Sequence, residues 1–313
     1  MKDLLTLAEC PASTIRELIQ LAIDFKRRPE AYRDAMQRRT LIMLFEKPSL
    51  RTRVSFETAM TRMGGHAIYY DLGRSPFGSG KETIADTART LSRYVDLIMA
   101  RLFEHDTLVE LARHATVPVI NGLTNDAHPT QVLADLQTIV EHKGRLDGLK
   151  LAYLGDGHNN VTHSLLAGCA KVGMHITVGC PEGAGYSPDP QVLRKAAGFA
   201  KRSGARVEVT HDPAVAVKDA DAVYTDSWMS YHIPTELKEE RLRIFMPYQV
   251  SAKLLRKARR NAIFMHCLPA TRGLEQAAEV IDGPQSVVFD EAENRLHMHA
   301  AILLRLLGQG ARK

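Results

Sequence analysis

Short apolar runs alternate with stretches of helical spacing along most of the chain. In the first half, the apolar runs have the length and the bulky side chains of buried strands, and the stretches between them place apolar residues three and four apart. The expected strands are Leu41–Phe45, Ala67–Tyr70, Leu97–Ala100 and Val117–Ile120, and the expected helices lie near Arg51–Met63, Thr83–Tyr94 and Thr107–Ala115. This alternation predicts a parallel sheet whose strands are joined by right-handed helical crossovers.

The second half of the chain repeats the scheme. The expected strands are Leu149–Leu154, Ile176–Gly179, Val207–Thr210, Ala222–Tyr224 and Ala262–Met265, with helices near Thr162–Val172, Gln191–Ala200 and Ala252–Ala258. The predicted fold class is α/β, with two doubly wound parallel-sheet domains and an active-site cleft between them, because ligands of such sheets bind at the carboxyl ends of the strands.

The boundary between the domains is expected near Gly144–Gly148, after a long helical pattern. A length of 313 residues suits two domains of ordinary size. We therefore expect one domain over residues 1–144 and a second over residues 145–294. A last helix with an apolar face, Arg295 to Leu307, belongs to the segment 295–313, which we expect to pack back on the first domain.

Composition and charge narrow the class of protein. Apolar residues make up 45% and charged residues 25%, as in soluble globular proteins, and no apolar run approaches the ~20 residues that span a bilayer. The N-terminus lacks the long apolar core of a signal peptide, so we expect a cytoplasmic protein with no membrane partner. The net charge of +5 comes from dispersed residues, and the one dense run, Lys253 to Arg260, has the pattern of a solvated helix face, which argues against nucleic acid as a partner.

Neither a metal nor a dinucleotide is indicated. The four cysteines are scattered and no two are spaced as Cys-x-x-Cys, so no zinc site or disulfide framework is expected; they are Cys10, Cys169, Cys180 and Cys267. Gly155-Asp156-Gly157 follows a predicted strand, but position 160 is Asn where the dinucleotide fingerprint requires its third glycine. We therefore expect no cofactor.

The most informative segment is Ser49-Leu50-Arg51-Thr52-Arg53, which lies between a predicted buried strand and a predicted helix. The backbone N–H groups and the positive dipole end of a helix start favour an anion. The hydroxyls of Ser49 and Thr52 can donate hydrogen bonds, and Arg51 offers a planar fork to phosphate or carboxylate oxygens. Taken alone, the segment is equally consistent with a helix cap and solvated arginines.

Further polar groups follow other predicted strands, at the edge where parallel sheets bind ligands. They are Arg101, His128-Pro129-Thr130-Gln131, Asn159-Asn160, Asp226-Ser227-Trp228-Met229-Ser230 and His266-Cys267-Leu268-Pro269. Pro129 is expected to open a helix, which would place His128 and Gln131 on one face. Each group also has a plainer interpretation: a surface ion pair for Arg101, helix caps or turns for the histidine and the asparagines, and a buried small side chain for Cys267.

Taken together, these segments resemble the carbamoyltransferase family, most closely its ornithine-type branch. Ser49–Arg53 is similar to the family's Ser-Thr-Arg-Thr-Arg motif, and His128–Gln131 to His-Pro-x-Gln. His266–Pro269 is similar to the branch's His-Cys-Leu-Pro motif, and Asp290–Arg295 to its C-terminal signature. The four motifs occur in the family's order, and the resemblance covers nearly the whole chain.

The resemblance implies transfer of a carbamoyl group from carbamoyl phosphate to an amine, with release of phosphate. It implies a carbamoyl-phosphate site made of Ser49, Leu50 through its backbone N–H, Arg51, Thr52, Arg101, His128, Gln131, Arg295 and the carbonyl of Leu268. It implies an L-ornithine site made of Asn160, Asp226, Ser230, Tyr231 and Cys267, with Arg101, His128, Asp226 and Cys267 as the catalytic residues. Family members are typically trimers in which the loop near Ser75–Lys81 of one subunit closes a neighbour's site.

Two departures from the family pattern leave the acceptor open. Leu50 stands where the family usually has Thr, and Ser230-Tyr231-His232 stands where ornithine enzymes usually carry Ser-Met-Gly. The bulkier Tyr231 can alter the acceptor pocket, whereas Asn159-Asn160 suit the carboxylate and amino group of an amino acid. Ornithine is favoured, and another amine such as putrescine or lysine is the alternative. A non-catalytic sensor of carbamoyl phosphate or an amino acid on the same fold is the alternative of another class.

Overall fold

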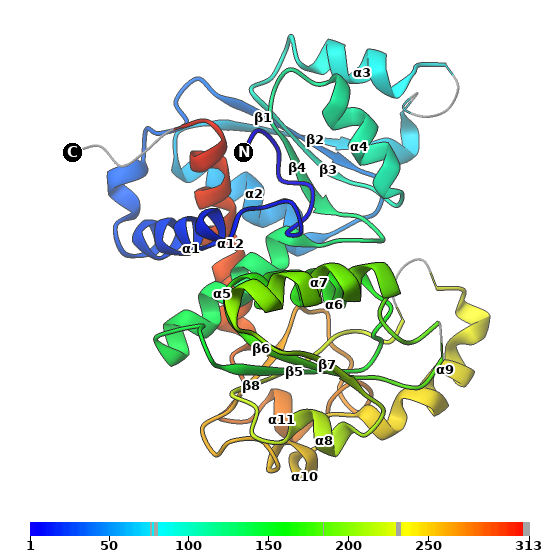
Figure 1. The fold of residues 1–313 in the computed structure, drawn as a ribbon. Helices are drawn as coiled ribbons and strands as arrows, with labels where there is room; N and C mark the ends of the chain where they lie inside the picture. Colours follow the sequence, from blue (N-terminus) through cyan, green and yellow to red (C-terminus); the bar gives the residue numbers. More distant parts are fainter. Residues whose placement is uncertain (76, 78–80, 184, 230–232, 309–313) are drawn as a thin grey trace. The chain divides into compact units, whose positions relative to one another are not determined.

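The computed structural model describes residues 1–75, 77, 81–183, 185–229 and 233–308 (Figure 1). The chain forms two compact units: unit 1 comprises Met1–Gln137 with Glu293–Lys313, and unit 2 comprises Thr138–Ala292. Each unit is built on one parallel β-sheet, of four strands in unit 1 and five in unit 2. The expected fold class, α/β with two parallel-sheet domains, is confirmed.

Unit 1 holds the strands β1 (Thr40–Phe45), β2 (His66–Asp71), β3 (Leu97–Arg101) and β4 (Val119–Leu123), in the spatial order β2-β1-β3-β4. Its helices are α1 (Ala12–Arg27), α2 (Leu50–Arg62), α3 (Ile84–Leu91), α4 (His105–His114) and α12 (Val288–Leu306), with 3₁₀ helices at Pro29–Tyr32 and Leu72–Arg74. Helix α5 (Pro129–Lys143) begins in unit 1 and runs into unit 2, and α12 begins in unit 2 and runs into unit 1. From β1, the chain places β2 on one side and β3 on the other, so the direction of strand addition reverses between β1 and β3. The carboxyl ends of these two strands are therefore the expected place for a ligand.

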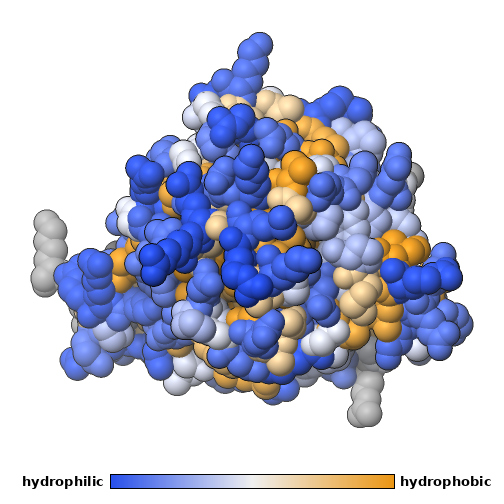
Figure 2. Space-filling view, turned by 90° about the horizontal axis from the view of Figure 1, so that it is seen from below, coloured by the Kyte–Doolittle hydropathy of each residue, from blue (hydrophilic) through white to orange (hydrophobic). Residues whose placement is uncertain are grey.

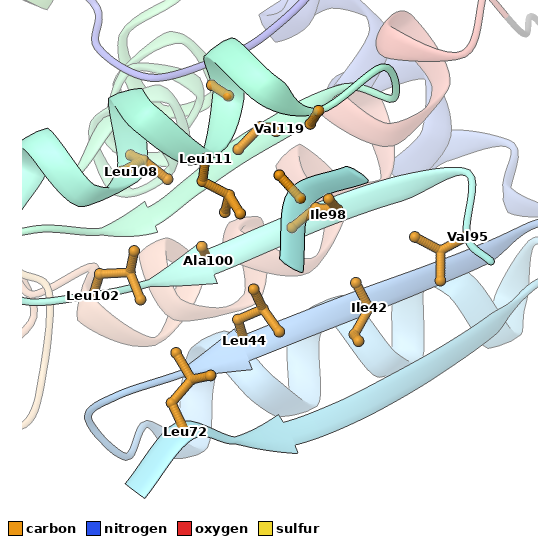
Figure 3. Close-up of a cluster of buried hydrophobic side chains, with 13 residues drawn as sticks. Ile42, Leu44, Leu72, Val95, Ile98, Ala100, Leu102, Leu108, Leu111 and Val119 are labelled. Atoms are coloured by element: carbon orange, nitrogen blue, oxygen red, sulfur yellow. The ribbon is translucent and has the colours of Figure 1, made fainter. Parts of the chain in front are cut away.

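The strands of unit 1 form because their residues are bulky, apolar and buried. All of β3 is buried, and on one face of the sheet Leu108 and Leu111 of α4 pack towards Ile98 and Ala100 of β3 (Figure 3). Burial of a side chain such as Leu111 contributes about 1.5–3 kcal/mol. β1 and β3 pair in parallel, with Phe45 opposite Arg101, so the loops that follow the two strands leave the sheet side by side.

Unit 2 holds the strands β5 (Lys150–Leu154), β6 (His175–Gly179), β7 (Val207–Thr210), β8 (Ala222–Thr225) and β9 (Ile263–His266), in the order β7-β6-β5-β8-β9. Its helices are α6 (Asn160–Lys171), α7 (Pro190–Ser203), α8 (Pro213–Val217), α9 (Lys238–Phe245), α10 (Ala252–Leu255) and α11 (Ala278–Ile281), with 3₁₀ helices at Thr235–Leu237 and Met246–Tyr248. Helices α6 and α7 cover one face of the sheet, and α8, α10 and α11 lie on the other (Figure 1). The strand order turns back between β5 and β8.

The predicted strands are all present, with ends that differ from the prediction by at most about three residues. The C-terminal helix begins at Val288 rather than Arg295, because Asp290 and Glu291 in its first turn stabilise the positive end of the helix. The charged residues of the basic run Lys253 to Arg260 are exposed. Only the first three residues of the run are helical, because α10 ends at Leu255. The alternation of strands and helices does not predict α1, α8, α9 or α11.

One face of the molecule is mainly hydrophilic (Figure 2). Figure 2 shows one face of the molecule, on which hydrophilic residues predominate and apolar residues gather in small groups. Within the part of the chain that the structure describes, none of the helices combines the length and the apolar character needed to cross a membrane.

Candidate active site

The first group of candidate residues lies where β1 leads into α2. Ser49 caps the helix, because its Oγ accepts a hydrogen bond from the Thr52 backbone N–H at 3.2 Å. Leu50 is the first helical residue and is 74% exposed, so its contribution to the helix start is its backbone. Arg51 lies half-buried in the same turn. The helix start therefore has the N–H groups, the hydroxyls and the dipole end of an anion site.

Two buried cations lie at the neighbouring strand ends. Arg101 ends β3 and is 5% exposed, and its carbonyl accepts a hydrogen bond from the Glu46 backbone N–H at 2.9 Å. Lys47 is buried, donates to Asn125 Oδ1 at 2.9 Å, and lies 4.5 Å from the centroid of the Phe103 ring. Burial, and then the charge of Arg101, lowers the pKa of Lys47 to about 8. The motif does not single out Lys47, although this lysine lies only two residues after the buried strand β1.

The start of α5 meets α12. Pro129 opens α5, as predicted. Gln131 donates from Nε2 to Asp135 Oδ1 at 2.8 Å and accepts on Oε1 a hydrogen bond from Arg295 Nη1. Arg295 also donates through Nη2 to Thr52 Oγ1 at 3.2 Å. Three side chains from distant parts of the sequence are thus joined in one hydrogen-bonded network.

His128 precedes α5 and is buried. Burial holds its pKa well below the usual value, and the charges of Arg295 and Arg101 lower the pKa further. The imidazole is therefore neutral, and a neutral imidazole can donate one N–H without adding a charge. Together with Arg101, Lys47 and Arg295, it gives this edge of unit 1 both charged and neutral donors, which suits an anion that carries a polar carbonyl group.

In unit 2, the loop after β5 ends at the start of α6. Asn159 caps that helix, because its Oδ1 accepts from the Thr162 backbone N–H at 2.8 Å and its Nδ2 donates to the Tyr153 hydroxyl at 2.8 Å. The plainer interpretation as a cap therefore applies to Asn159. Asn160 is the first helical residue and is half-buried, and its carbonyl accepts from Ser164 Oγ at 2.8 Å.

Asp226 and Cys267 meet because they follow the adjacent strands β8 and β9. The Cys267 thiol donates to Asp226 Oδ1 at 3.0 Å, and the same oxygen accepts from the Ser227 backbone N–H at 2.7 Å. Cys267 is only partly buried, so it is not the buried small side chain of the plainer interpretation. The ligand atoms of Asp226, His266 and Cys267 lie within 4.8 Å of one another, the one such trio among the described residues. Thiolate, imidazole and carboxylate are ligands that zinc accepts.

The segment after β9 has an unusual backbone. Leu268 has a φ of 56°, in the left-handed region, and its N–H donates to His266 Nδ1 at 2.9 Å. The His266 N–H donates to Glu291 Oε2 at 3.0 Å, and the Tyr224 hydroxyl donates to Glu291 Oε1 at 3.2 Å. Through these two hydrogen bonds, the buried side chain of Glu291 connects β8 and β9 to the first turn of α12. The sequence marked Glu291 only as part of the C-terminal signature.

Ser230 and Tyr231 lie outside the described residues, as do positions 76 and 78–80 of the loop near Ser75–Lys81. Within unit 1 the structure brings together Thr52, Gln131 and Arg295, and within unit 2 it brings together Asp226 and Cys267.

Comparisons with known proteins agree over nearly the whole chain. The family model described as "Aspartate/ornithine carbamoyltransferase, carbamoyl-P binding domain" matches residues 2–141, and the one described as "Aspartate/ornithine carbamoyltransferase, Asp/Orn binding domain" matches residues 147–306. A protein named ornithine carbamoyltransferase from Anoxybacillus flavithermus is 51% identical over 309 residues, which cover 98% of this chain and 96% of that relative.

Solved structures are similar as well. The ornithine carbamoyltransferase from Pyrococcus furiosus has a TM-score of 0.92 at 48% identity, covering 98% of this chain and 97% of that one. The ornithine transcarbamoylase from Giardia lamblia has a TM-score of 0.90 at 42% identity, covering 98% of both chains.

Proposed function

Because the chain belongs to the aspartate/ornithine carbamoyltransferase family, we propose that it transfers the carbamoyl group of carbamoyl phosphate to the side-chain amine of L-ornithine. The products are L-citrulline and phosphate. The observation that carries the proposal is the network in which Arg295 joins Thr52, at the anion-binding start of α2, to Gln131 at the start of α5. Relatives named for ornithine, one of them 51% identical, support ornithine as the acceptor.

In this proposal, unit 1 binds carbamoyl phosphate. Ser49, Arg51, Thr52 and the Leu50 backbone N–H hold the phosphate, which the helix start supports electrostatically. Arg101, His128, Gln131 and Arg295 surround the carbamoyl group, and the Leu268 carbonyl is the acceptor proposed for its amino group. Buried Lys47 adds positive charge beside Arg101. The arginines balance the phosphate charge, so the proposal includes no metal and no cofactor.

The chemistry follows from the charge that develops. The uncharged amine of ornithine attacks the carbonyl carbon, and negative charge grows on the carbonyl oxygen before the C–O bond to phosphate breaks. Arg51, Thr52, Arg101 and the neutral His128 are donors for that oxygen, and one such donor typically contributes about 10²–10³-fold in rate. The proton that the amine loses is accepted by a phosphate oxygen or by the Asp226–Cys267 pair.

Unit 2 binds the acceptor amino acid in this proposal. The residues proposed for its amino-acid end are Asn160, Asp226 and Ser230, Tyr231 is a further proposed ornithine-binding residue, and Asp226 and Cys267 are assigned to the attacking amine. The hydrogen bond between Cys267 and Asp226 supports a shared role, because it holds the thiol and the carboxylate next to each other. Positioning two substrates together supplies much of the rate in reactions of this kind.

We further propose that the enzyme is a cytoplasmic homotrimer or a multiple of trimers. Ile68 and Tyr70 are exposed on the edge strand β2, and Leu50 and Val54 are exposed on α2, which packs against β2. Apolar side chains exposed along a sheet edge are typical of a subunit contact. Light scattering after size-exclusion chromatography tests the assembly, and a monomeric mass at micromolar concentration contradicts it.

The test of the function is phosphate release from carbamoyl phosphate with a panel of acceptors: ornithine, putrescine, lysine, N-acetylornithine and aspartate. We expect the largest kcat/KM with ornithine. A preference for putrescine or lysine would support carbamoyl transfer but contradict ornithine as the acceptor, and it would point to the segment around Tyr231 as the cause. No release with any acceptor would favour the non-catalytic sensor.

A further inference from the structure

One buried side chain beside the candidate site has no role in the proposed function. His299 lies one turn after Arg295 on α12 and is fully buried. Its ring stacks on Phe56 of α2, with 3.7 Å between ring centroids and 12° between planes. The stack holds the imidazole in one orientation, so that each ring nitrogen has a fixed neighbour.

The hydrogen bonds around His299 have a defined direction. The Ser55 hydroxyl donates to the Arg51 carbonyl at 2.5 Å, so Ser55 Oγ accepts from His299 Nδ1, which lies 2.9 Å away. The Nδ1 position therefore carries the ring proton. His299 Nε2 is then an acceptor, and it faces Nε and Nη2 of Arg295, each at 3.4 Å. Burial, followed by the charge of Arg295, keeps the pKa of His299 well below its usual value, so the ring has only this one proton.

From this geometry we propose that His299 is a positioning residue, which fixes the guanidinium of Arg295 and the first turn of α2 relative to each other for carbamoyl-phosphate binding. The proposal rests on the proposed function. The chain of donors runs from Arg295 through His299 and Ser55 to the carbonyl of Arg51. It therefore links two arginines that we assign to the same substrate.

The other bonds of Arg295 show what the link adds. Nη1 donates to Gln131 and Nη2 to Thr52, while Nε and Nη2 face His299. Without the acceptor at His299, Arg295 loses the hydrogen bond from its Nε, and its guanidinium is held less rigidly. Carbamoyl phosphate would then have to order Arg295 on binding, which weakens binding without removing a contact to the acceptor amino acid.

The test uses substitutions that separate packing from hydrogen bonding. His299→Phe keeps a ring to stack on Phe56 and removes both nitrogens, whereas His299→Gln keeps one donor and one acceptor. Ser55→Ala removes the hydroxyl that connects His299 to the Arg51 carbonyl, at the other end of this series of hydrogen bonds. The matched control is His297→Phe, because His297 is buried on the same helix but contacts Glu293 and the Phe25 ring instead.

We expect His299→Phe to raise KM for carbamoyl phosphate about tenfold, the loss of one hydrogen bond to a charged group, with KM for ornithine unchanged. His299→Gln should restore most of the affinity, and Ser55→Ala should give a smaller rise that does not add to that of His299→Phe. Titration calorimetry with inorganic phosphate should show the same order of affinities without turnover. His297→Phe should match the wild type in both assays.

Two results would overturn the inference. One is an unchanged KM for carbamoyl phosphate and unchanged phosphate affinity in His299→Phe. The other is an equal rise in both KM values in His299→Phe and His297→Phe, which would mean a general loss of packing. If His299→Phe does not fold, Ser55→Ala and His299→Gln decide by the same readouts. Absence of turnover in the wild type would contradict the proposed function instead, and the phosphate titration would still test the link.

Discussion

Replacing Arg241 by methionine is expected to destabilise unit 2 by about 3–5 kcal/mol, the usual cost of removing one partner of a buried ion pair. Arg241 Nη2 lies 2.5 Å from Asp156 Oδ2, and the two side chains are only 9% and 5% exposed. Arg241 Nε also donates to the Trp228 carbonyl at 2.9 Å. The substitution keeps most of the side-chain volume but leaves the Asp156 carboxylate buried without this cation.

Trp228 makes the measurement specific to unit 2. It is the single tryptophan of the chain, is fully buried, and stacks on Phe245. Its fluorescence during urea unfolding therefore reports on this unit. With a urea dependence of about 1–3 kcal/mol per molar, a loss of about 3–5 kcal/mol should lower the midpoint by about 1–5 M. Arg241→Met combined with Asp156→Asn should be less destabilised than Arg241→Met alone, because no carboxylate remains buried.

The matched control is an exposed pair in the same unit. Arg272 and Asp282 also form two short hydrogen bonds, at 2.8 and 2.6 Å, but their side chains are 47% and 52% exposed. Water screens that pair, so Arg272→Met should leave the midpoint close to that of the wild type. If Arg241→Met shifts the midpoint no more than Arg272→Met does, the reasoning from burial is wrong.

Three further predictions concern the site. Arg51→Ala should lower kcat/KM by at least about 10²-fold with an unchanged unfolding midpoint, and retained turnover would remove Arg51 from the phosphate site. Cys267→Ala should raise KM for ornithine and lower kcat, because the thiol is the donor to Asp226, whereas KM for carbamoyl phosphate should stay constant. Unchanged kinetics would mean that Cys267 only packs. Since an anion stabilises the protonated form of Lys47, KM for carbamoyl phosphate should rise as the pH passes upward through about 8. Lys47→Met should raise that KM at neutral pH and remove this dependence, and an identical pH profile in both proteins would exclude the assignment.

The strands were predictable because each is a short, continuous apolar run, as in β1 and β5. The start of α5 was predictable for a different reason, since proline favours the first helical position and Pro129 occupies it. Helix α1 was not predicted. Ile15, Leu18 and Ile19 follow helical spacing there, but the helix stands outside the alternation of strands and helices on which the prediction rests.

The motifs name the candidate residues, but they do not predict the contacts between them. Arg295 meets Gln131 across 164 positions of sequence, and only the packing of α12 against the start of α5 brings them together. The contacts of Lys47 with Asn125 and Phe103, and the stacking of His299 on Phe56, likewise join residues that are far apart in the sequence. A pattern of neighbouring residues contains no information on such distances. The motif that carries Tyr231 departs from the family, and its role in choosing the acceptor stays a prediction.

The measurement that tests the central claim most directly is the joint quantification of citrulline and phosphate after the protein is mixed with carbamoyl phosphate and L-ornithine. The proposed function predicts equal amounts of the two products, formed only when ornithine is present. Phosphate released at the same rate without ornithine, or ornithine left unmodified while carbamoyl phosphate is consumed, would contradict it.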